Sequence, residues 1–90
     1  LKEEVLSGRM AKVTLTGGDN SVAGETKFTV NLATLFGSGA AADDAIATVK
    51  EEASNLIVYP EVTGNGTGSL DIVFMPQVAN SAYRAVISIV

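Results

Sequence analysis

Histidine and cysteine are both absent from the 90 residues of this chain. Histidine is the usual proton shuttle near neutral pH and the commonest metal ligand. Cysteine supplies thiolate nucleophiles, soft metal ligands and disulfides. Without them, only carboxylates, hydroxyls and a few basic side chains remain for chemistry. We therefore expect a protein that is not an enzyme and that holds no cofactor and no metal.

Charge is also scarce. Charged residues make up 18% of the chain, below the roughly 25% of an ordinary globular domain. The net charge is −4, and the six basic residues form no cluster in the sequence: Lys2, Arg9, Lys12, Lys27, Lys50 and Arg84. Nucleic acids and anionic membranes both attract grouped Lys and Arg. We expect neither of them as a partner.

Long hydrophobic runs are missing too, since none approaches the roughly 20 residues that span a bilayer. Apolar residues nevertheless make up 47% of the chain, enough for one folded domain of this length. Met10, followed by Ala11 and Lys12, resembles a natural start. We expect a flexible or partner-docked arm over residues 1–9 and a single domain over residues 10–90.

Alternation of apolar and polar residues, the pattern of a half-buried strand, appears in four segments. These are residues 12–16, 27–32, 70–75 and 83–90, all rich in β-branched or aromatic side chains. One side of each segment predicts the core: Val13, Leu15, Phe28, Val30, Leu32, Leu70, Ile72, Phe74, Tyr83, Ala85, Ile87 and Ile89.

A different period appears between the second and third of these segments. From Ala40 to Val58, apolar residues recur at gaps of three and four, which favours an amphipathic helix with Ser38 as its cap and Pro60 beyond its end. The predicted order is β-β-α-β-β. We expect an α+β fold, with a four-stranded antiparallel or mixed sheet and one helix packed on one face.

The last two predicted strands are apolar on both faces. If the helix covers one face, the other face exposes Val73, Met75, Val86 and Val90. Exposed apolar patches usually mark partner surfaces, so these four residues are the predicted interface. Two alternatives stay open: the arm over residues 1–9 or a loop of the same chain covers the patch, or a one-residue register slip exchanges the two faces.

Several motifs formally resemble chemical sites. Asp43-Asp44 and Glu51-Glu52 fit the polar face of the predicted helix, and Asp19-Asn20-Ser21 with Glu25 fits turn chemistry better than a calcium loop. Gly37-Ser38-Gly39 lacks the Gly-Lys-Ser/Thr ending of a phosphate-binding loop. Asn65-Gly66-Thr67 matches the glycosylation pattern, but the Asn-Gly dipeptide favours a turn. None of them predicts catalysis.

The remaining hypothesis is a structural or assembly subunit that works through protein–protein surfaces, as a homo-oligomer or in a larger assembly. Small, cysteine-free chains rich in Ala, Val, Thr and Gly resemble, in general character, minor structural proteins of bacteriophage particles such as head decoration subunits. No motif carries this resemblance, and it assigns no residue. The alternative is a binding module for a peptide or small ligand that uses the loop Gly17–Gly24 or a sheet edge.

Overall fold

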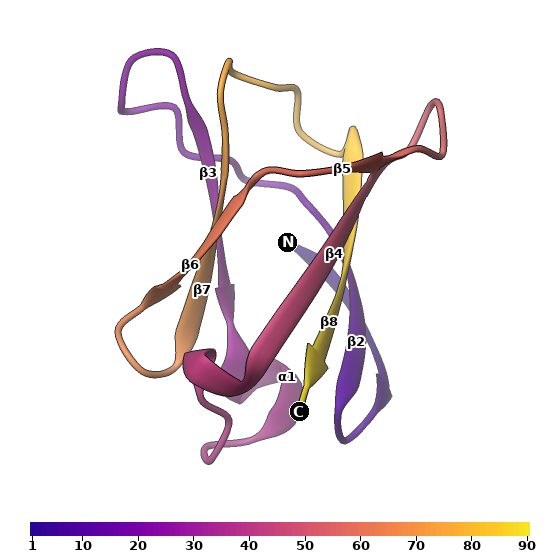
Figure 1. The fold of residues 1–90 in the computed structure, drawn as a ribbon, viewed down its shortest axis with the longest axis vertical. Coiled ribbons are helices and arrows are strands. Elements are labelled where there is room, and N and C mark those ends of the chain that lie inside the picture. The colour runs from indigo at the N-terminus through magenta and orange to yellow at the C-terminus, as the bar shows by residue number, and fades with distance from the viewer.

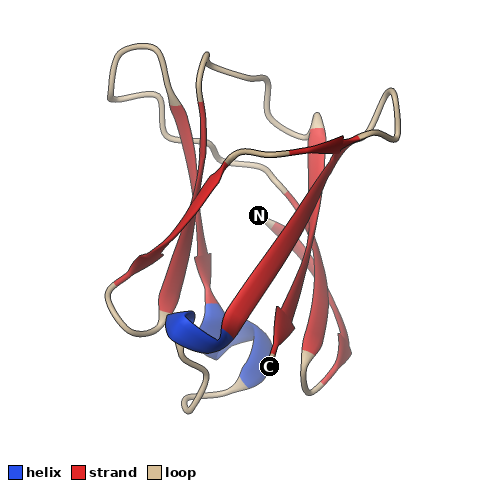
Figure 2. Ribbon diagram, in the orientation of Figure 1, coloured by secondary structure: helices blue, strands red, loops and turns tan.

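Two antiparallel sheets packed face to face make up the protein, in a computed structural model that describes residues 1–90 (Figure 1; Figure 2). The five-stranded sheet has the order β1 (Lys2–Ser7), β2 (Met10–Thr14), β8 (Tyr83–Ile89), β4 (Ala45–Glu51) and β5 (Ile57–Val58). The three-stranded sheet has the order β3 (Thr26–Asn31), β7 (Ser69–Phe74) and β6 (Glu61–Asn65). Two short helices, α1 (Leu32–Phe36) and the 3-10 turn η1 (Ala42–Asp44), close one end.

The core lies between the two sheets and is almost entirely apolar. Every predicted core residue is buried except Tyr83 and Ile89, which are partly buried. Phe74 joins the two sheets: its ring meets Phe28 edge-on at 5.9 Å and lies 4.5 Å from the ring of Tyr83, between centroids. The sequence pattern therefore identified the inward faces of the four predicted strands, which β2, β3, β7 and β8 confirm with small shifts at their ends.

The predicted α+β fold is wrong, because the segment expected to be a long helix is extended. Residues 45–51 form β4, which pairs along its whole length with β8. Ala45, Ala47 and Val49 turn inward on alternate positions while Ile46 and Thr48 are exposed. Alanine fits either period. The β-branched residues between the alanines favour a strand, and the backbone of this strand is paired with β8.

The only α-helix lies earlier in the chain, directly after β3. Asn31 caps it, because its side-chain oxygen accepts hydrogen bonds from the backbone amides of Ala33 and Thr34 at 3.0 and 3.2 Å. Ser38, the predicted cap, lies beyond the end of this helix. None of the helices has the length and hydropathy needed to cross a membrane.

The last two predicted strands do not form a hairpin. β7 belongs to the three-stranded sheet and pairs with β3 and β6, whereas β8 lies between β2 and β4 at the centre of the other sheet. Residues 75–82 carry the chain from one sheet to the other (Figure 1). The predicted four-stranded sheet is thus split in two, and each half packs on the other instead of on a helix.

Residues 1–9, predicted as an arm, contribute an edge strand. β1 pairs antiparallel with β2, and all six of its residues are exposed. Docking of this segment on a partner stays a prediction.

Candidate functional site

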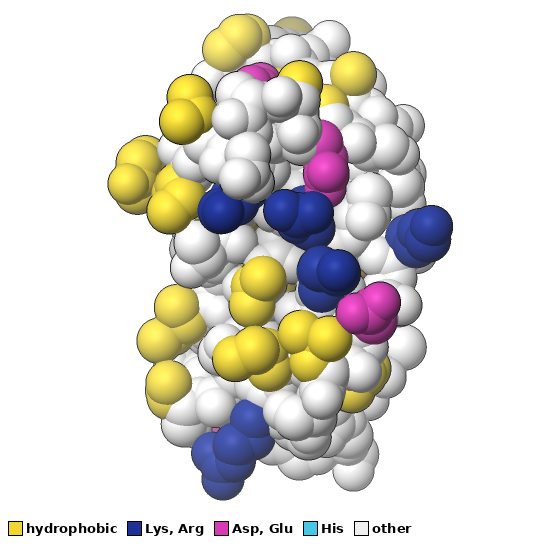
Figure 3. Space-filling view, turned by 90° about the vertical axis from the view of Figure 1, so that its right-hand side faces the viewer, with side chains coloured by type: hydrophobic (Ala, Val, Ile, Leu, Met, Phe, Trp, Pro, Cys, Tyr) yellow, Lys and Arg dark blue, Asp and Glu magenta, His cyan; other side chains and the backbone are white.

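The outer face of the five-stranded sheet, which points away from the core, is the first candidate site (Figure 3). Strand register places its side chains in three rows across β2, β8 and β4: Met10–Ser88–Ile46, Lys12–Val86–Thr48 and Thr14–Arg84–Lys50. The intervening residues, such as Ala11, Val13, Ala85 and Ile87, are fully buried. The side chains of the three rows therefore point away from the core, because successive side chains of a strand point to opposite faces.

One end of this face is apolar. We call Met10, Ile46, Val86 and Val90 the apolar patch. Ile46 is 55% exposed and Val90 70% exposed, while Val86 is partly buried. Figure 3 shows yellow side chains between the basic side chains at mid-height and a further basic side chain at the bottom of the view. Contiguous apolar groups exposed on a sheet face usually mark an interaction surface.

The other end of the face is charged. Four of the six basic residues of the chain gather there: Lys2, Lys12, Lys50 and Arg84. Lys12 forms an ion pair with Glu4 at 3.8 Å, and Arg84 forms one with Glu52 at 3.5 Å. Lys2 and Lys50 have no ion-pair partner. Residues that are scattered along the sequence are thus brought together by the sheet, a grouping that linear spacing could not reveal.

The four predicted interface residues do not share one surface. Val86 and Val90 lie on β8 and just beyond it, within the apolar patch. Val73 lies on β7 in the other sheet, between Lys27 and Glu61, and Met75 follows at the end of that strand with 73% exposure. Met10 and Ile46 lie on the same face as Val86 instead. The sequence pattern did not indicate this, because it favoured a helix around Ile46 and a chain start at Met10.

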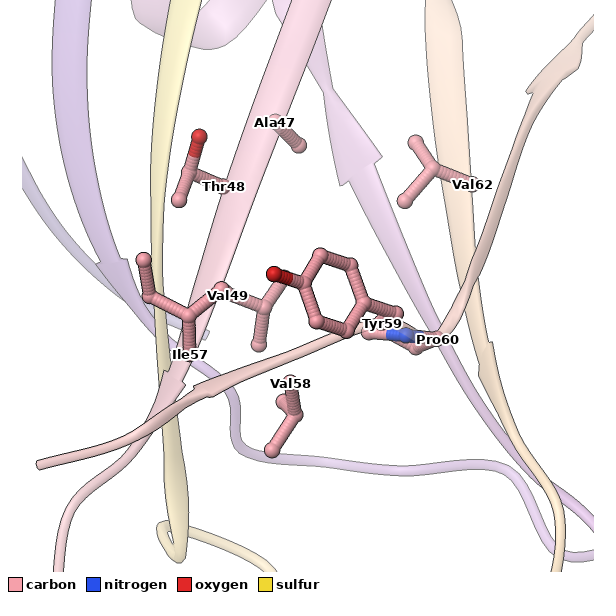
Figure 4. A pocket seen from close by; sticks show the side chains of 8 residues that line it. All are labelled: Ala47, Thr48, Val49, Ile57, Val58, Tyr59, Pro60 and Val62. Carbon is pink, nitrogen blue, oxygen red and sulfur yellow. The ribbon is translucent and has the colours of Figure 1, made fainter. Parts of the chain in front are cut away.

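A second candidate site is a pocket between β4, β5 and β6 (Figure 4), with a volume of about 140 Å³. Its lining is mainly apolar: Ala47, Thr48, Val49, Ile57, Val58, Tyr59, Pro60 and Val62. Tyr59 is 91% exposed. Its ring lies in front of Val49 in the view of Figure 4, so one large aromatic side chain stands at the mouth of the pocket with almost no packing of its own.

Beside this pocket, the edge of β4 is open. The amide of Val90 donates to the carbonyl of Asp44, and the amide of Glu52 donates to that of Ala82. The backbone N–H and C=O groups of even-numbered β4 residues therefore bond to β8. Those of odd-numbered residues point toward the opposite edge of the strand, as antiparallel pairing requires. On that side β5 pairs only with Val49 and Lys50. The backbone groups of Ala47 consequently face the pocket edge without a strand partner.

The loop Gly17–Gly24 is anchored rather than free. The amide of Gly18 donates to the Asn80 side chain at 2.9 Å, and the backbones of Asp19 and Lys27 exchange two hydrogen bonds. The amide of Ser21 donates to the Asp19 carboxylate at 2.8 Å, an Asx turn. This bond, with a smaller contribution from Lys27, lowers the pKa of Asp19 below its ordinary value.

The carboxylates expected on a helix face lie elsewhere. Asp43 and Asp44 lie in η1, and Glu51 accepts a hydrogen bond from the Tyr83 hydroxyl at 3.5 Å. Glu52 pairs with Arg84. No three residues among Asp and Glu are close enough together to hold a metal ion, and no buried side-chain polar atom lacks a hydrogen-bond partner. The geometry offers surfaces and one apolar pocket.

Comparisons of the chain with protein families, with curated proteins and with solved structures find no match.

Proposed function

We propose that this protein is a non-enzymatic assembly subunit that binds other protein chains through the outer face of its five-stranded sheet. The observation that supports this most is the apolar patch, in which Met10, Ile46 and Val90 are exposed on a face that the rest of the chain leaves open. Such a role matches the general character of small virion structural proteins, and neighbouring capsid or portal genes would support that setting.

Burial of the apolar patch supplies the driving force for association. Removing apolar surface from water contributes about 25 cal/mol per Å², and side chains at the centre of an interface carry most of the binding free energy. The charged end of the same face would fix how a partner is aligned on it, because opposite charges across an interface steer the right partner and disfavour wrong ones.

Sedimentation velocity across a wide concentration range tests this function. We expect wild-type protein to associate and Ile46→Lys to disperse the complex, because a lysine there would be desolvated without a partner. Val22→Lys is the matched control, since Val22 is 52% exposed in a loop and Ile46 is 55% exposed in the patch. Equal behaviour of the two variants, in the presence and absence of cell extract proteins, would contradict the proposal.

The second candidate function is binding of an extended peptide at the edge of β4. The unpaired backbone of Ala47 beside an apolar pocket favours it, because strand addition uses such an edge for hydrogen bonds and pockets for alternate side chains. Titration of peptides with alternating apolar residues should shift the amide NMR signals of residues 45–49 and 57–62 and leave those of β1 unchanged. Ile57→Lys should weaken this binding without changing sedimentation.

A further inference from the structure

The open edge beside Ala47 exists because β5 ends early. β5 pairs Val58 with Val49, and the same register, continued along the chain, would bring Pro60 opposite Ala47. Proline has no N–H to donate to a neighbouring strand. The chain leaves β4 at this point and runs across to β6 (Figure 1). The amide and the carbonyl of Ala47 are left facing the pocket as a result.

This open stretch of β4 is short. On one side of Ala47, the amide of Ala45 is already bonded to the carbonyl of Ala42. On the other side, β5 occupies the edge beside Val49. Ala47 is thus the residue whose amide and carbonyl are both free on this edge. It offers a partner one N–H and one C=O, the two groups that a hydrogen-bonded antiparallel pair exchanges.

A partner residue paired with Ala47 would send its side chain into the pocket. Directly opposite residues of an antiparallel pair lie on the same face, and Ala47 packs against the core. Three valines that reach the core line the pocket beside it: Val49, Val58 and Val62. Figure 4 shows Ala47 on β4 and Val62 on β6 on either side of the space between these strands.

The pocket has the size and the lining for one uncharged hydrocarbon group. Its volume is about 140 Å³, and an apolar cavity of about 150 Å³ in another protein binds benzene. No charged side chain lines it. A lysine or glutamate side chain placed there would lose its hydration without gaining a partner. A phenyl or isobutyl group meets neither penalty.

Tyr59 is positioned to cover such a group. Its side chain is 91% exposed, and its ring lies at the mouth of the pocket (Figure 4). An aromatic ring that enters the pocket would meet this ring, and aromatic pairs contribute to binding beyond the area they bury. The exposed tyrosine would then gain the packing that it lacks in the free protein.

On this basis, and resting on the second candidate function, we propose that the pocket recognises a single apolar residue of a partner chain, with phenylalanine or leucine as the preferred side chain. The backbone N–H and C=O of that residue pair with Ala47, its side chain fills the pocket, and Tyr59 packs over it. The chemistry recognised is a hydrocarbon group of phenyl size carried between two amides.

The smallest ligand with both features is N-acetyl-phenylalanine N-methylamide, and NMR titration of the wild-type protein measures its binding. We expect a dissociation constant of about a millimolar, with shifts in the amide signals of residues 47–49 and 57–62 and none in β1. The alanine analogue lacks the ring, and toluene lacks the amides. Each should bind at least about tenfold more weakly, since one loses the apolar burial and the other the hydrogen bonds.

Two variants separate the contributions of the pocket and of the tyrosine. Ala47→Leu fills the pocket and keeps the backbone edge, so the preference for the phenylalanine ligand over the alanine analogue should disappear. Tyr59→Ala should weaken the phenylalanine ligand by about twofold to tenfold. Leu56→Ala is the matched control, because Leu56 is 66% exposed just before β5 and lies outside the pocket. Circular dichroism that matches wild type shows that each variant folds.

The outcomes distinguish this proposal from the function on which it rests. Loss of the preference in Ala47→Leu, or weakening in Tyr59→Ala but not in Leu56→Ala, supports the single-residue site. A phenylalanine ligand that binds no better than its alanine analogue overturns it. Binding no better than toluene also overturns it, because the pocket then takes free hydrocarbons. If longer peptides with alternating apolar residues still shift residues 45–49 in those cases, the second candidate function stands without a selective pocket. If neither ligand nor peptide shifts these signals, both fall.

Discussion

The hydroxyl of Thr26 accepts a hydrogen bond from the amide of Val78 at 3.1 Å, although 52 residues separate the two in the sequence. Thr26 is fully buried at the start of β3, and its hydroxyl also donates to the side chain of Asn20. One side chain thus connects the loop after β2 to the loop between β7 and β8. Both loops cross from one sheet to the other, so this contact fixes how the sheets meet at that end.

Thr26→Val should destabilise the fold by about 1–3 kcal/mol, because the shape is kept while the buried amide of Val78 loses its acceptor. Urea unfolding followed by circular dichroism measures the free energy of unfolding. Thr29→Val is the control, because the Thr29 hydroxyl donates to Asp71 at an exposed position of the same strand, and its effect should stay within about 0.5 kcal/mol. A Thr26→Val protein within about 0.5 kcal/mol of wild type would show that the Thr26 hydrogen bond is unimportant.

Gly18→Ala should destabilise the fold by about 1–3 kcal/mol through overpacking. A β-carbon there would lie 2.5 Å from Cγ2 of Thr26 and 3.0 Å from Oδ1 of Asn80. Gly39→Ala is the control, since its β-carbon would have no neighbour within 4 Å. Thermal unfolding of both variants checks this. A Gly18→Ala protein whose melting temperature equals that of wild type would contradict the close packing of the loop.

The lowered pKa of Asp19 predicts that the stability of the fold depends on pH. Its pKa in the folded protein is lowered, so the charged form stabilises the fold at pH values above the ordinary pKa of 3.8, and this contribution is lost as the pH falls through the folded pKa. Asp19→Asn should therefore melt at a lower temperature than wild type at neutral pH, with the difference shrinking as the pH falls below 3.8. An NMR titration of the carboxyl carbon should give a midpoint below that of an exposed aspartate. A midpoint at or above 3.8 would refute the Asx turn.

Val86→Lys and Val73→Lys should behave differently although both lie on outward faces. Val86 belongs to the apolar patch, whereas Val73 lies between Lys27 and Glu61 on the opposite side of the molecule. We expect Val86→Lys to weaken association and Val73→Lys to leave it unchanged, as measured by light scattering. The reverse result would move the interface to the three-stranded sheet.

Inward and outward positions of the predicted strands could be read from the sequence, because alternation is a local property. Leu70, Ile72 and Phe74 were placed in the core on this ground, and all three are buried. The pairing of strands could not be read in this way. The eight residues between β7 and β8 are compatible with a hairpin or with a crossover to the other sheet, and contacts far away in the sequence decide between them.

The error at β4 has a related cause. Ala42, Ala45, Ile46 and Val49 satisfy helical spacing, whereas Ala45, Ala47 and Val49 satisfy strand spacing, so alanine left the period undetermined. The same error concealed half of the candidate site. Once β4 is a strand, Ile46 lies in a row with Met10 across Ser88, and Lys50 lies beside Arg84.

The position of β8 has a consequence for synthesis of the protein. It is the last of the eight strands in sequence and the middle one of its sheet, flanked by β2 and β4. A nascent chain that has not yet released residues 83–89 from the ribosome holds two pairs of strands, β1 with β2 and β4 with β5, and has no strand to join them. The larger sheet can therefore be completed only after β8 has emerged, and chaperones that shield apolar strands can act on the two separate pairs until then.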